Sequence, residues 1–458
     1  MRITPLKLKL AAVLTASATA AALGVGVAAT PAGAVAPTIQ PHRVKVFPDS
    51  RKVSTNTDAA QFTCQGRPID GSQGIVCYDP SQIQNAYGVS PLLQNGKDGS
   101  GRTIVIVDAF QNPFIGADLA TFDHLFGLPD PVFDNTVMPG TPAFDPNDAN
   151  QVGWGEETTL DVLWAHAIAP GAKIRLISAA SNNDTDILAA TQFAVDHDLG
   201  DVLSQSFGEN ENCVDPTLLA AQHQMFAKAA RQGWTVFASS GDSGASQFTC
   251  DGTGAVEVAS NPASDPLVTG VGGTTLSADI DGNYLGETAW TEGIFTGCNA
   301  PAVADADINC SGGGFSDIYP KPSFQKSMVK GKVGRGVPDI AYNAGVNGGV
   351  LTVCSVCNNG VPAVFLFGGT SAGTPQWSGL AAIADQVAHH RLGDINPTLY
   401  QIASNKHRFA ATLNDVTVGN NDVAEIGGGF DAAQGWDPVT GLGTPKAAQL
   451  VPMLVKRG

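Results

Sequence analysis

An alternation of short apolar runs and helical stretches between residues 103 and 241 constrains the fold of this chain most strongly. The β-branched run 103–110 (TIVIVDAF) predicts a strand, and the pattern that follows at 115–128 predicts a helix. The series continues with a strand at 172–178, a helix at 183–198, a strand at 201–208, a helix at 215–233 and a strand at 234–241. Strands separated by helices need crossover connections, so we expect a parallel sheet with helices on both faces.

One large α/β domain with loop insertions accounts for residues 81–458. Residues 245–335 and the stretch after 412 are rich in Gly, Asn, Asp and Pro, which predicts loops and short strands. The run 363–369 (AVFLFGG) predicts one more strand, and 371–390 predicts one more helix. With 43% hydrophobic and 15% charged residues, the chain has the composition of a globular protein with a sizeable core.

The first 34 residues have the composition of a secretory signal peptide. Arg2, Lys7 and Lys9 form a positive start, an alanine-rich apolar stretch follows, and Ala32-x-Ala34 fits a small-residue cleavage site. A membrane anchor is the alternative, but hydroxyl-bearing residues dilute the apolar stretch. We therefore expect a secreted, extracellular protein that is not attached to a membrane once the signal is removed.

The formal net charge of −17 argues against a nucleic-acid partner, because such a chain repels phosphate backbones. The simpler interpretation of this charge is a well-solvated acidic surface. We expect a monomer that acts on polypeptides.

Residues 35–80 are polar and turn-rich, and they predict an N-terminal arm or a short pro-segment.

Eight cysteines in an exported chain indicate disulfide bonds. The simplest of many connectivities joins sequence neighbours: Cys64–Cys77, Cys213–Cys250, Cys298–Cys310 and Cys354–Cys357. The Cys354-x-x-Cys357 spacing is also typical of half a zinc site, but no second such pair exists, so a structural bridge is favoured.

Ser371 lies in the small-residue stretch 368–375 (GGTSAGTP), between a predicted strand and a predicted helix. Small residues allow a close-packed turn, and the dipole and free N–H groups at a helix start favour developing negative charge. This setting is typical of a nucleophile, although a serine that only caps the helix is an equally simple interpretation. A serine nucleophile also needs a group that takes its proton.

Glu157 and Asp161 are the candidate proton acceptors, since no histidine lies in a small-residue setting typical of a catalytic imidazole. Four residues apart on a helix, their side chains lie about 40° apart around the axis. Glu157 would act as general base toward Ser371, and Asp161 would orient Glu157. Glu156 should point elsewhere, and His166 should lie on the opposite side of the helix. The alternative is an acidic helix start that is stabilised by the helix dipole.

Asp242 lies in the glycine-flanked turn 239–244 (SSGDSG), at the end of a predicted strand. In its acid form it could donate a hydrogen bond to an oxyanion on the attacked carbonyl. The alternative is an ordinary turn aspartate, because aspartate favours such turns.

Taken together, these motifs resemble those of the sedolisins, which are serine-carboxyl peptidases with a subtilisin-like fold. GGTSAGTP is similar to their serine motif, EETTLD (156–161) to their acid pair and SSGDSG to the turn with their oxyanion aspartate. The resemblance runs from about residue 80 to the end. It implies that Ser371 is the nucleophile and Glu157 the general base. It also implies that Asp161 orients Glu157 and that Asp242 stabilises the oxyanion. Asp108 ends the first strand where a subtilisin would carry its triad aspartate, and it would be structural here.

The resemblance also implies one structural Ca²⁺ ion in the C-terminal loops. Its ligands would be the carboxylates of Asp415 and Asp437 and the carbonyls of Val416, Ala433 and Gly435. Such a mixed set of oxygen ligands suits calcium, although a metal-free Asp- and Gly-rich loop is the alternative.

The function that these expectations predict is a secreted, acid-acting serine endopeptidase, because a carboxylate base titrates at lower pH than a histidine. Three alternatives stay open: a silent binding protein of the same fold, an ordinary subtilisin, and a tripeptidyl-peptidase. Sedolisins usually carry a long folded activation domain. Only about 50 residues separate the predicted signal from the NAYGV motif (85–89), so precursor control is in doubt.

Overall fold

The computed structural model describes residues 50–59, 61–69, 74–292, 309–423 and 426–456, and the predicted signal peptide 1–34 lies outside these ranges. The helices of the described ranges are α1 (Pro80–Ala86), α2 (Ser90–Gln94), α3 (Ile115–Phe126), α4 (Ala149–Ile168), α5 (Asp184–Asp196), α6 (Pro216–Arg231), α7 (Thr370–Ala388), α8 (Asn396–Ala403), α9 (Lys406–Thr412) and α10 (Ala447–Val455).

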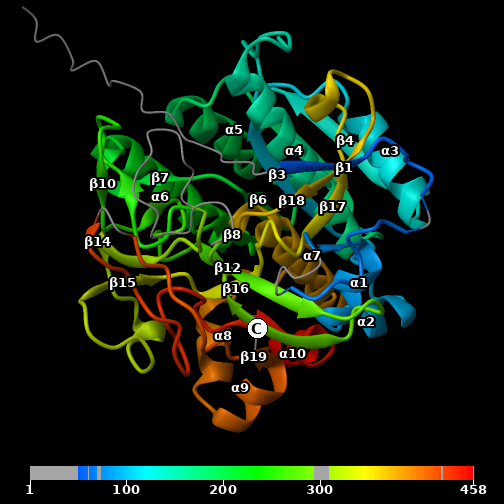
Figure 1. Cartoon of the computed structure of the whole chain (residues 1–458). Coiled ribbons are helices and arrows are strands. Elements are labelled where there is room, and N and C mark those ends of the chain that lie inside the picture. Colours follow the sequence, from blue (N-terminus) through cyan, green and yellow to red (C-terminus); the bar gives the residue numbers. More distant parts are fainter. Residues whose placement is uncertain (1–49, 60, 70–73, 293–308, 424–425, 457–458) are drawn as a thin grey trace, which may run out of the picture. The chain divides into compact units, whose positions relative to one another are not determined.

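A mostly parallel sheet forms the centre of the domain (Figure 1). Its strands are β3 (Thr103–Ala109), β4 (Val132–Val137), β5 (Lys173–Ala179), β6 (Val202–Gln205), β8 (Thr235–Ser239), β12 (Thr269–Ala278), β13 (Tyr284–Ala289) and β16 (Ile340–Asn343). The order across the sheet is β4-β5-β3-β6-β8-β12-β13, and β16 also pairs with β12. All pairings are parallel except that of β12 with β13, as the crossover argument predicts.

Side chains that alternate along β3 divide the core into two layers. Ile104 and Ile106 point toward the layer that contains α4 and α7, whereas Val105 and Val107 point toward α5 and α6. Because successive strand residues face opposite sides, a continuous apolar run such as TIVIV is what a strand buried on both faces requires. The expected helices on both faces of the sheet are therefore confirmed.

A second sheet of four strands leads to Ser371. Its strands are β1 (Ser50–Ser54), β2 (Cys77–Tyr78), β17 (Gly349–Val353) and β18 (Val364–Phe367), in the order β1-β18-β17-β2. The predicted strand at 363–369 therefore lies outside the parallel sheet, because β17 and β18 pair antiparallel across a short connection. The N-terminal arm contributes β1, in which Ser50 pairs with Phe367 at the end of β18 that leads to α7.

Short strand pairs and disulfides hold the remaining loops. The pairs are β7 (Glu209–Asn210) with β11 (Ser260–Asn261), β9 (Gln247–Phe248) with β10 (Ala255–Val256), β14 (Gly314–Pro320) with β15 (Gly334–Val337), and β19 (Leu413–Asn414) with β20 (Thr444–Pro445). The predicted bridges Cys64–Cys77, Cys213–Cys250 and Cys354–Cys357 are present. Cys298 of the fourth predicted bridge lies outside the described residues. Within the described ranges, no helix has both the length and the apolar character needed to cross a membrane.

Candidate active site

Glu157 and Asp161 project from α4 into the interior of the domain. The helix starts where the Asp148 side chain accepts hydrogen bonds from the N–H groups of Asn150 and Gln151, and it then passes through the core. Glu157 and Asp161 are both fully buried, one helical turn apart. The acid pair therefore lies in the protein interior and is not a solvated, acidic helix start.

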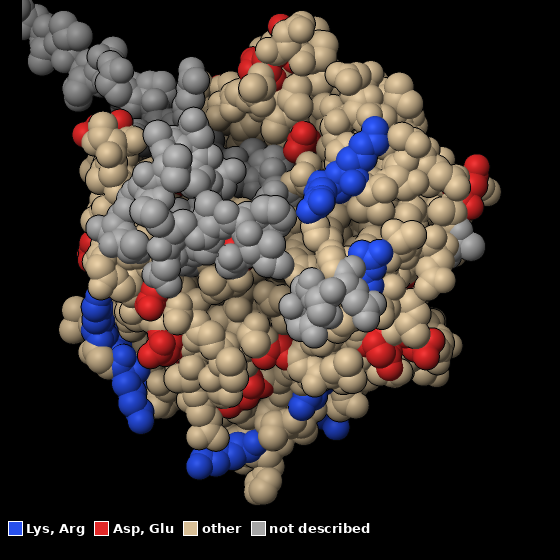
Figure 2. Space-filling view, in the orientation of Figure 1, with Lys and Arg blue, Asp and Glu red and all other residues tan. Residues whose placement is uncertain are grey.

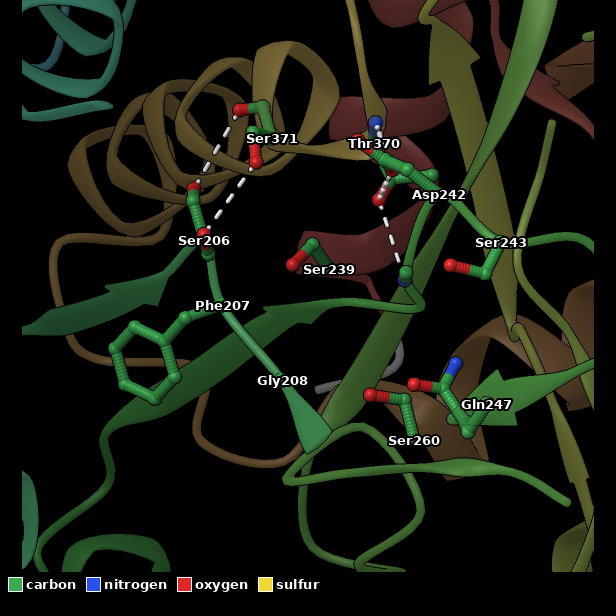
Figure 3. A pocket seen from close by; sticks show the side chains of 11 residues that line it. Ser206, Phe207, Gly208, Ser239, Asp242, Ser243, Gln247, Ser260, Thr370 and Ser371 are labelled. Carbon is green, nitrogen blue, oxygen red and sulfur yellow. Dashed lines mark hydrogen bonds between the residues drawn. The ribbon is translucent and has the colours of Figure 1, made fainter. Parts of the chain in front are cut away.

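Ser371 lies in the first turn of α7, directly after β18. Gly369 has a φ of 92°, which favours glycine, and a Cβ at this position would lie 2.6 Å from Oδ2 of Asp242. The glycine therefore allows Asp242 to approach the helix start. Ser371 is 7% exposed, and its hydroxyl borders a pocket (Figure 3).

Asp242 is anchored to the residue before the candidate nucleophile. Its Oδ1 accepts hydrogen bonds from the Thr370 backbone N–H at 2.9 Å and from the Thr370 hydroxyl at 2.6 Å. Asp242 also lines the same pocket as Ser371. The glycine-flanked turn thus brings its carboxyl group to the helix start, where the sequence predicts it.

Ser206, which the sequence analysis does not single out, links the acid pair to the candidate nucleophile. Figure 3 shows Ser206 beside Ser371. The Ser206 hydroxyl donates to Oδ1 of Asp161 at 2.7 Å, and the Ser206 carbonyl accepts from the Ser371 hydroxyl at 3.3 Å. Ser206 follows β6 directly, so the carboxyl end of a central strand positions it. Its place near the end of the predicted strand 201–208 is the one sequence signal that points to it.

The Ser371 hydroxyl lies near enough to Glu157 to lower the pKa of that carboxyl, although burial dominates and raises it overall. Neither carboxyl oxygen of Glu157 accepts a hydrogen bond from a residue that the structure describes. The two side chains are therefore neighbours, but they do not form a hydrogen bond of ordinary geometry. Hydrogen bonds between catalytic groups are often long in unliganded proteins and shorten when substrate binds.

Asp108 is a third carboxyl group beside the acid pair. It is fully buried at the end of β3, and burial raises its pKa to about 7. After burial, the charge of Asp108 is the next largest influence that raises the pKa of both Glu157 and Asp161. Asp108, Glu157 and Asp161, here called the carboxyl cluster, therefore compete for negative charge and titrate as a coupled group.

The histidines of the described ranges do not line the pocket that contains Ser371. His166 lies on α4 but is buried elsewhere, with Nε2 at 3.2 Å from Asp123 and 3.0 Å from the Pro129 carbonyl. Glu156 accepts a hydrogen bond from the Ser50 hydroxyl of β1 at 3.4 Å. Both residues therefore point away from the carboxyl cluster, in agreement with the helix geometry.

The predicted calcium ligands lie in two loop segments that contact each other. The Asp415 carboxyl accepts from the Gly435 N–H at 3.0 Å, and the Asp437 carboxyl accepts from the Ala433 N–H at 3.1 Å. Val416 follows Asp415 and is buried. Burial raises the pKa of Asp437 to about 6. These five residues carry the oxygen types that calcium binds, two carboxylates and three carbonyls, although the described residues hold no group of three or more His, Cys, Asp or Glu placed to bind a metal.

A parallel sheet covered by helices on both faces, with a serine at a helix start beside buried acids, defines the class of protein. A family model described as the subtilase family matches residues 136–416 of the chain. The solved structure of Pseudomonas sedolisin, titled as a serine-carboxyl proteinase complexed with two molecules of pseudo-iodotyrostatin, superposes with a TM-score of 0.69 at 27% sequence identity. This match covers 84% of this chain and 99% of that one. The fold is therefore subtilisin-like.

Curated relatives identify the family more closely. Kumamolisin from Bacillus sp. (strain MN-32) is 34% identical over 84% of this chain, and sedolisin from Pseudomonas sp. (strain 101) is 33% identical over 73%. Human tripeptidyl-peptidase 1 is 28% identical over 84% of the chain. The chain belongs to the sedolisin family, as its motifs predict. It spans only 65% of the length of kumamolisin, 54% of sedolisin and 66% of the human relative.

Proposed function

We propose that the protein is a secreted peptidase that hydrolyses polypeptides through Ser371 and acts at acid pH. The observation that carries this proposal is the placement of the buried carboxyl of Glu157 beside the Ser371 hydroxyl, with Asp242 at the same helix start. Membership of the sedolisin family supports the reaction class.

In the proposed reaction, the Ser371 oxygen attacks the carbonyl carbon of a peptide bond while Glu157 takes the hydroxyl proton. The tetrahedral intermediate places its oxyanion between the acid form of Asp242 and the N–H groups at the start of α7. Glu157 returns the proton to the leaving amine, and an acyl-enzyme remains. Water then hydrolyses the ester by the reverse sequence of proton transfers. Asp161, held by the Ser206 hydroxyl, orients and polarises Glu157.

Acid action follows from the identity of the base. The carboxyl cluster must lose a proton before Ser371 can be activated, while Asp242 must keep its own. The rate is therefore expected to be bell-shaped, with its maximum below pH 7. The described part of the face in Figure 2 shows acidic and basic side chains interspersed, which supports a polypeptide substrate over a phosphate backbone.

Hydrolysis of denatured casein at pH 4 and pH 8 tests this function, with the Ser371→Ala variant as control. Cleavage at pH 4 that the variant lacks would support the proposal. Cleavage only at pH 8 would indicate an ordinary subtilisin, and no cleavage at either pH would indicate a silent binding protein. Mass spectrometry of the products distinguishes internal cuts, which we propose, from tripeptides released at N-termini.

We propose in addition that Asp415, Val416, Ala433, Gly435 and Asp437 bind one structural Ca²⁺ ion. The ion would neutralise the Asp437 carboxyl, which is 2% exposed. Added Ca²⁺ should raise the melting temperature of chelator-treated protein, and Asp437→Asn should abolish this rise. An unchanged melting temperature in Ca²⁺ would contradict the site.

Three described disulfides support an oxidising destination outside the cell.

A further inference from the structure

A small pocket beside Ser371 has no part in the proposed proton transfers (Figure 3). Its volume is about 20 Å³, which is room for one small group. Ser371 and Asp242 border it on one side, and the backbone of residues 206–208 forms another wall. Gln247 and Ser260 lie on the side away from Ser371, as Figure 3 shows. A group that reacts at Ser371 therefore has this pocket within reach.

The lining of the pocket contains polar groups without partners. Gln247 is 9% exposed, and its carboxamide makes no hydrogen bond to any residue within the described ranges. The Ser243 hydroxyl likewise has no partner there, and the Ser260 hydroxyl makes one long hydrogen bond, 3.4 Å to the Glu209 carbonyl. The polar atoms of Gln247 and Ser243 are open to solvent through the pocket and are not buried without partners. A ligand that displaces water from the pocket must therefore both donate to Gln247 and accept from it.

The charges around the pocket narrow the choice of ligand. Among the described residues that line it, Asp242 is the one ionisable side chain, and no Lys, Arg or His is present. An anionic ligand group would therefore lack a counter-charge, and a cationic one would need Asp242 ionised, which the proposed reaction does not allow. An apolar group would leave Gln247 unpaired. An uncharged group with both a donor and an acceptor fits best.

Two glycines give the pocket its narrow shape. A Cβ at Gly208 would lie 2.2 Å from the Ser260 hydroxyl oxygen, and a Cβ at Gly241 would lie 3.0 Å from Nε2 of Gln247. The backbone of both walls therefore lies directly against the polar groups. A flat carboxamide matches such a slot better than a branched or bulky side chain does.

We propose that Gln247 makes the peptidase selective for Asn or Gln as the residue whose carbonyl Ser371 attacks. When the carbonyl oxygen faces Asp242, the Cα of that residue is one bond from the reacting carbon, so its side chain enters the pocket. Its amide then pairs with the Gln247 carboxamide and with the hydroxyls of Ser243 and Ser260. The inference rests on the proposed function, because it needs an active Ser371.

The test uses peptides that differ only at this position, in the pairs Asn against Leu and Gln against Met, whose members are matched in size. We expect kcat/KM at acid pH to be about tenfold higher or more for the amide of each pair, as for one additional hydrogen bond. In Gln247→Leu the ratio should fall to one or below. Gln224→Leu, at an exposed position of α6, should keep the ratio of the unmodified protein.

Each outcome decides between the inference and the proposed function. Equal kcat/KM within both pairs, or a preference for amides that survives in Gln247→Leu, would overturn the inference and leave the peptidase function intact. If the unmodified protein cleaves neither these peptides nor casein between pH 3 and 8, the proposed function itself fails. Reversal of the ratio in Gln247→Leu, but not in Gln224→Leu, would establish Gln247 as the selecting residue.

Discussion

Two buried groups of ionisable residues in this protein differ in whether their carboxyl groups are paired with a cation. Arg335 and Asp339 are both fully buried, and a hydrogen bond of 2.7 Å joins them. Tyr400 and Gln325 donate to the other oxygen of Asp339, and Arg335 also donates to three backbone carbonyls. We call Arg335, Asp339, Gln325 and Tyr400 the ion-pair cluster.

The carboxyl cluster is equally buried, but no Lys, Arg or His of the described residues pairs with it. Both oxygens of Asp108, both of Glu157 and one of Asp161 accept no hydrogen bond from the described residues. Folding gains nothing from three acids placed in this way. Burial raises the pKa of all three, and the charge of Asp108 raises the pKa of Glu157 and Asp161 further. The comparison teaches that the ion-pair cluster serves stability, whereas the carboxyl cluster costs stability and, in the proposed reaction, activates Ser371.

The largest effect on activity is expected from Ser371→Ala. Loss of the nucleophile should lower kcat/KM for a peptide by about 10⁴-fold or more, with little change in melting temperature. Ser378→Ala is a matched control, because Ser378 is a buried serine of the same helix whose hydroxyl donates to the Thr374 carbonyl. Comparable losses in both variants would show that α7 tolerates no change, and would remove the special role of Ser371.

Glu157→Gln should lower kcat/KM by about 10³-fold, the upper part of the range for a general base. The protein should be as stable as before or more stable, because the variant removes a buried acid while keeping its shape. Glu156→Gln, one residue earlier on α4, is the control and should keep activity within a few-fold. A Glu157→Gln variant that is less stable and fully active would reverse the comparison between the clusters.

Arg335→Met should have the opposite profile. It leaves the buried Asp339 without its cation, so the free energy of unfolding should fall by about 3–5 kcal/mol. The kcat/KM of the fraction that remains folded should stay within a few-fold. Chemical denaturation measures the free energy of unfolding. Peptide hydrolysis, normalised by active-site titration, measures the kcat/KM of the folded fraction. A stable Arg335→Met variant with low activity would place the ion-pair cluster in the catalytic machinery.

The pH dependence of stability extends the comparison to other buried acids. Burial raises the pKa of Glu156 and Asp385 to about 7 and that of Asp118 to about 6. The folded chain therefore binds these protons more tightly than the unfolded chain. The contribution of the three protons to the free energy of unfolding is complete below about pH 4, and it is lost as the pH rises toward 7. The inactive Ser371→Ala variant should melt at a higher temperature at pH 4.5 than at pH 7.5, and a higher value at pH 7.5 would contradict the account.

The smallest expected effect comes from Asp108→Asn. Because the charge of Asp108 raises the pKa of Glu157, its removal should shift the acid limb of the kcat/KM profile to lower pH by less than about one unit. Asp118→Asn is the control, since Asp118 is equally buried but is bonded to Ser355. An unchanged profile in Asp108→Asn would remove Asp108 from the carboxyl cluster.

Much of this arrangement could be predicted from local sequence. Short, continuous apolar runs identify strands such as β3, and the spacing of Glu157 and Asp161 puts them on one face of α4. The short motifs around Asp242 and Ser371 identify the turns that carry them. These inferences succeed because the interactions involved lie within one element or at its end.

The rest depends on contacts between distant segments. The sequence gives no reason for the hydroxyl of Ser206 to bond Asp161, or for Gln247 of β9 and Ser260 of β11 to border the same pocket. The antiparallel pairing of β1 with β18 likewise requires the fold. The family motifs predict a structural role for Asp108, because Asp161 fills the place of the triad aspartate, but burial beside two other acids gives Asp108 an electrostatic effect.

The pH dependence of kcat/KM for a single peptide, measured from pH 3 to 8, tests most directly whether a carboxyl group activates Ser371. The account predicts a bell whose maximum lies below pH 7, with little activity at pH 8. A rate that instead rises to a plateau that persists at pH 8 would contradict the account, because no carboxyl group such as Asp242 would then have to keep its proton.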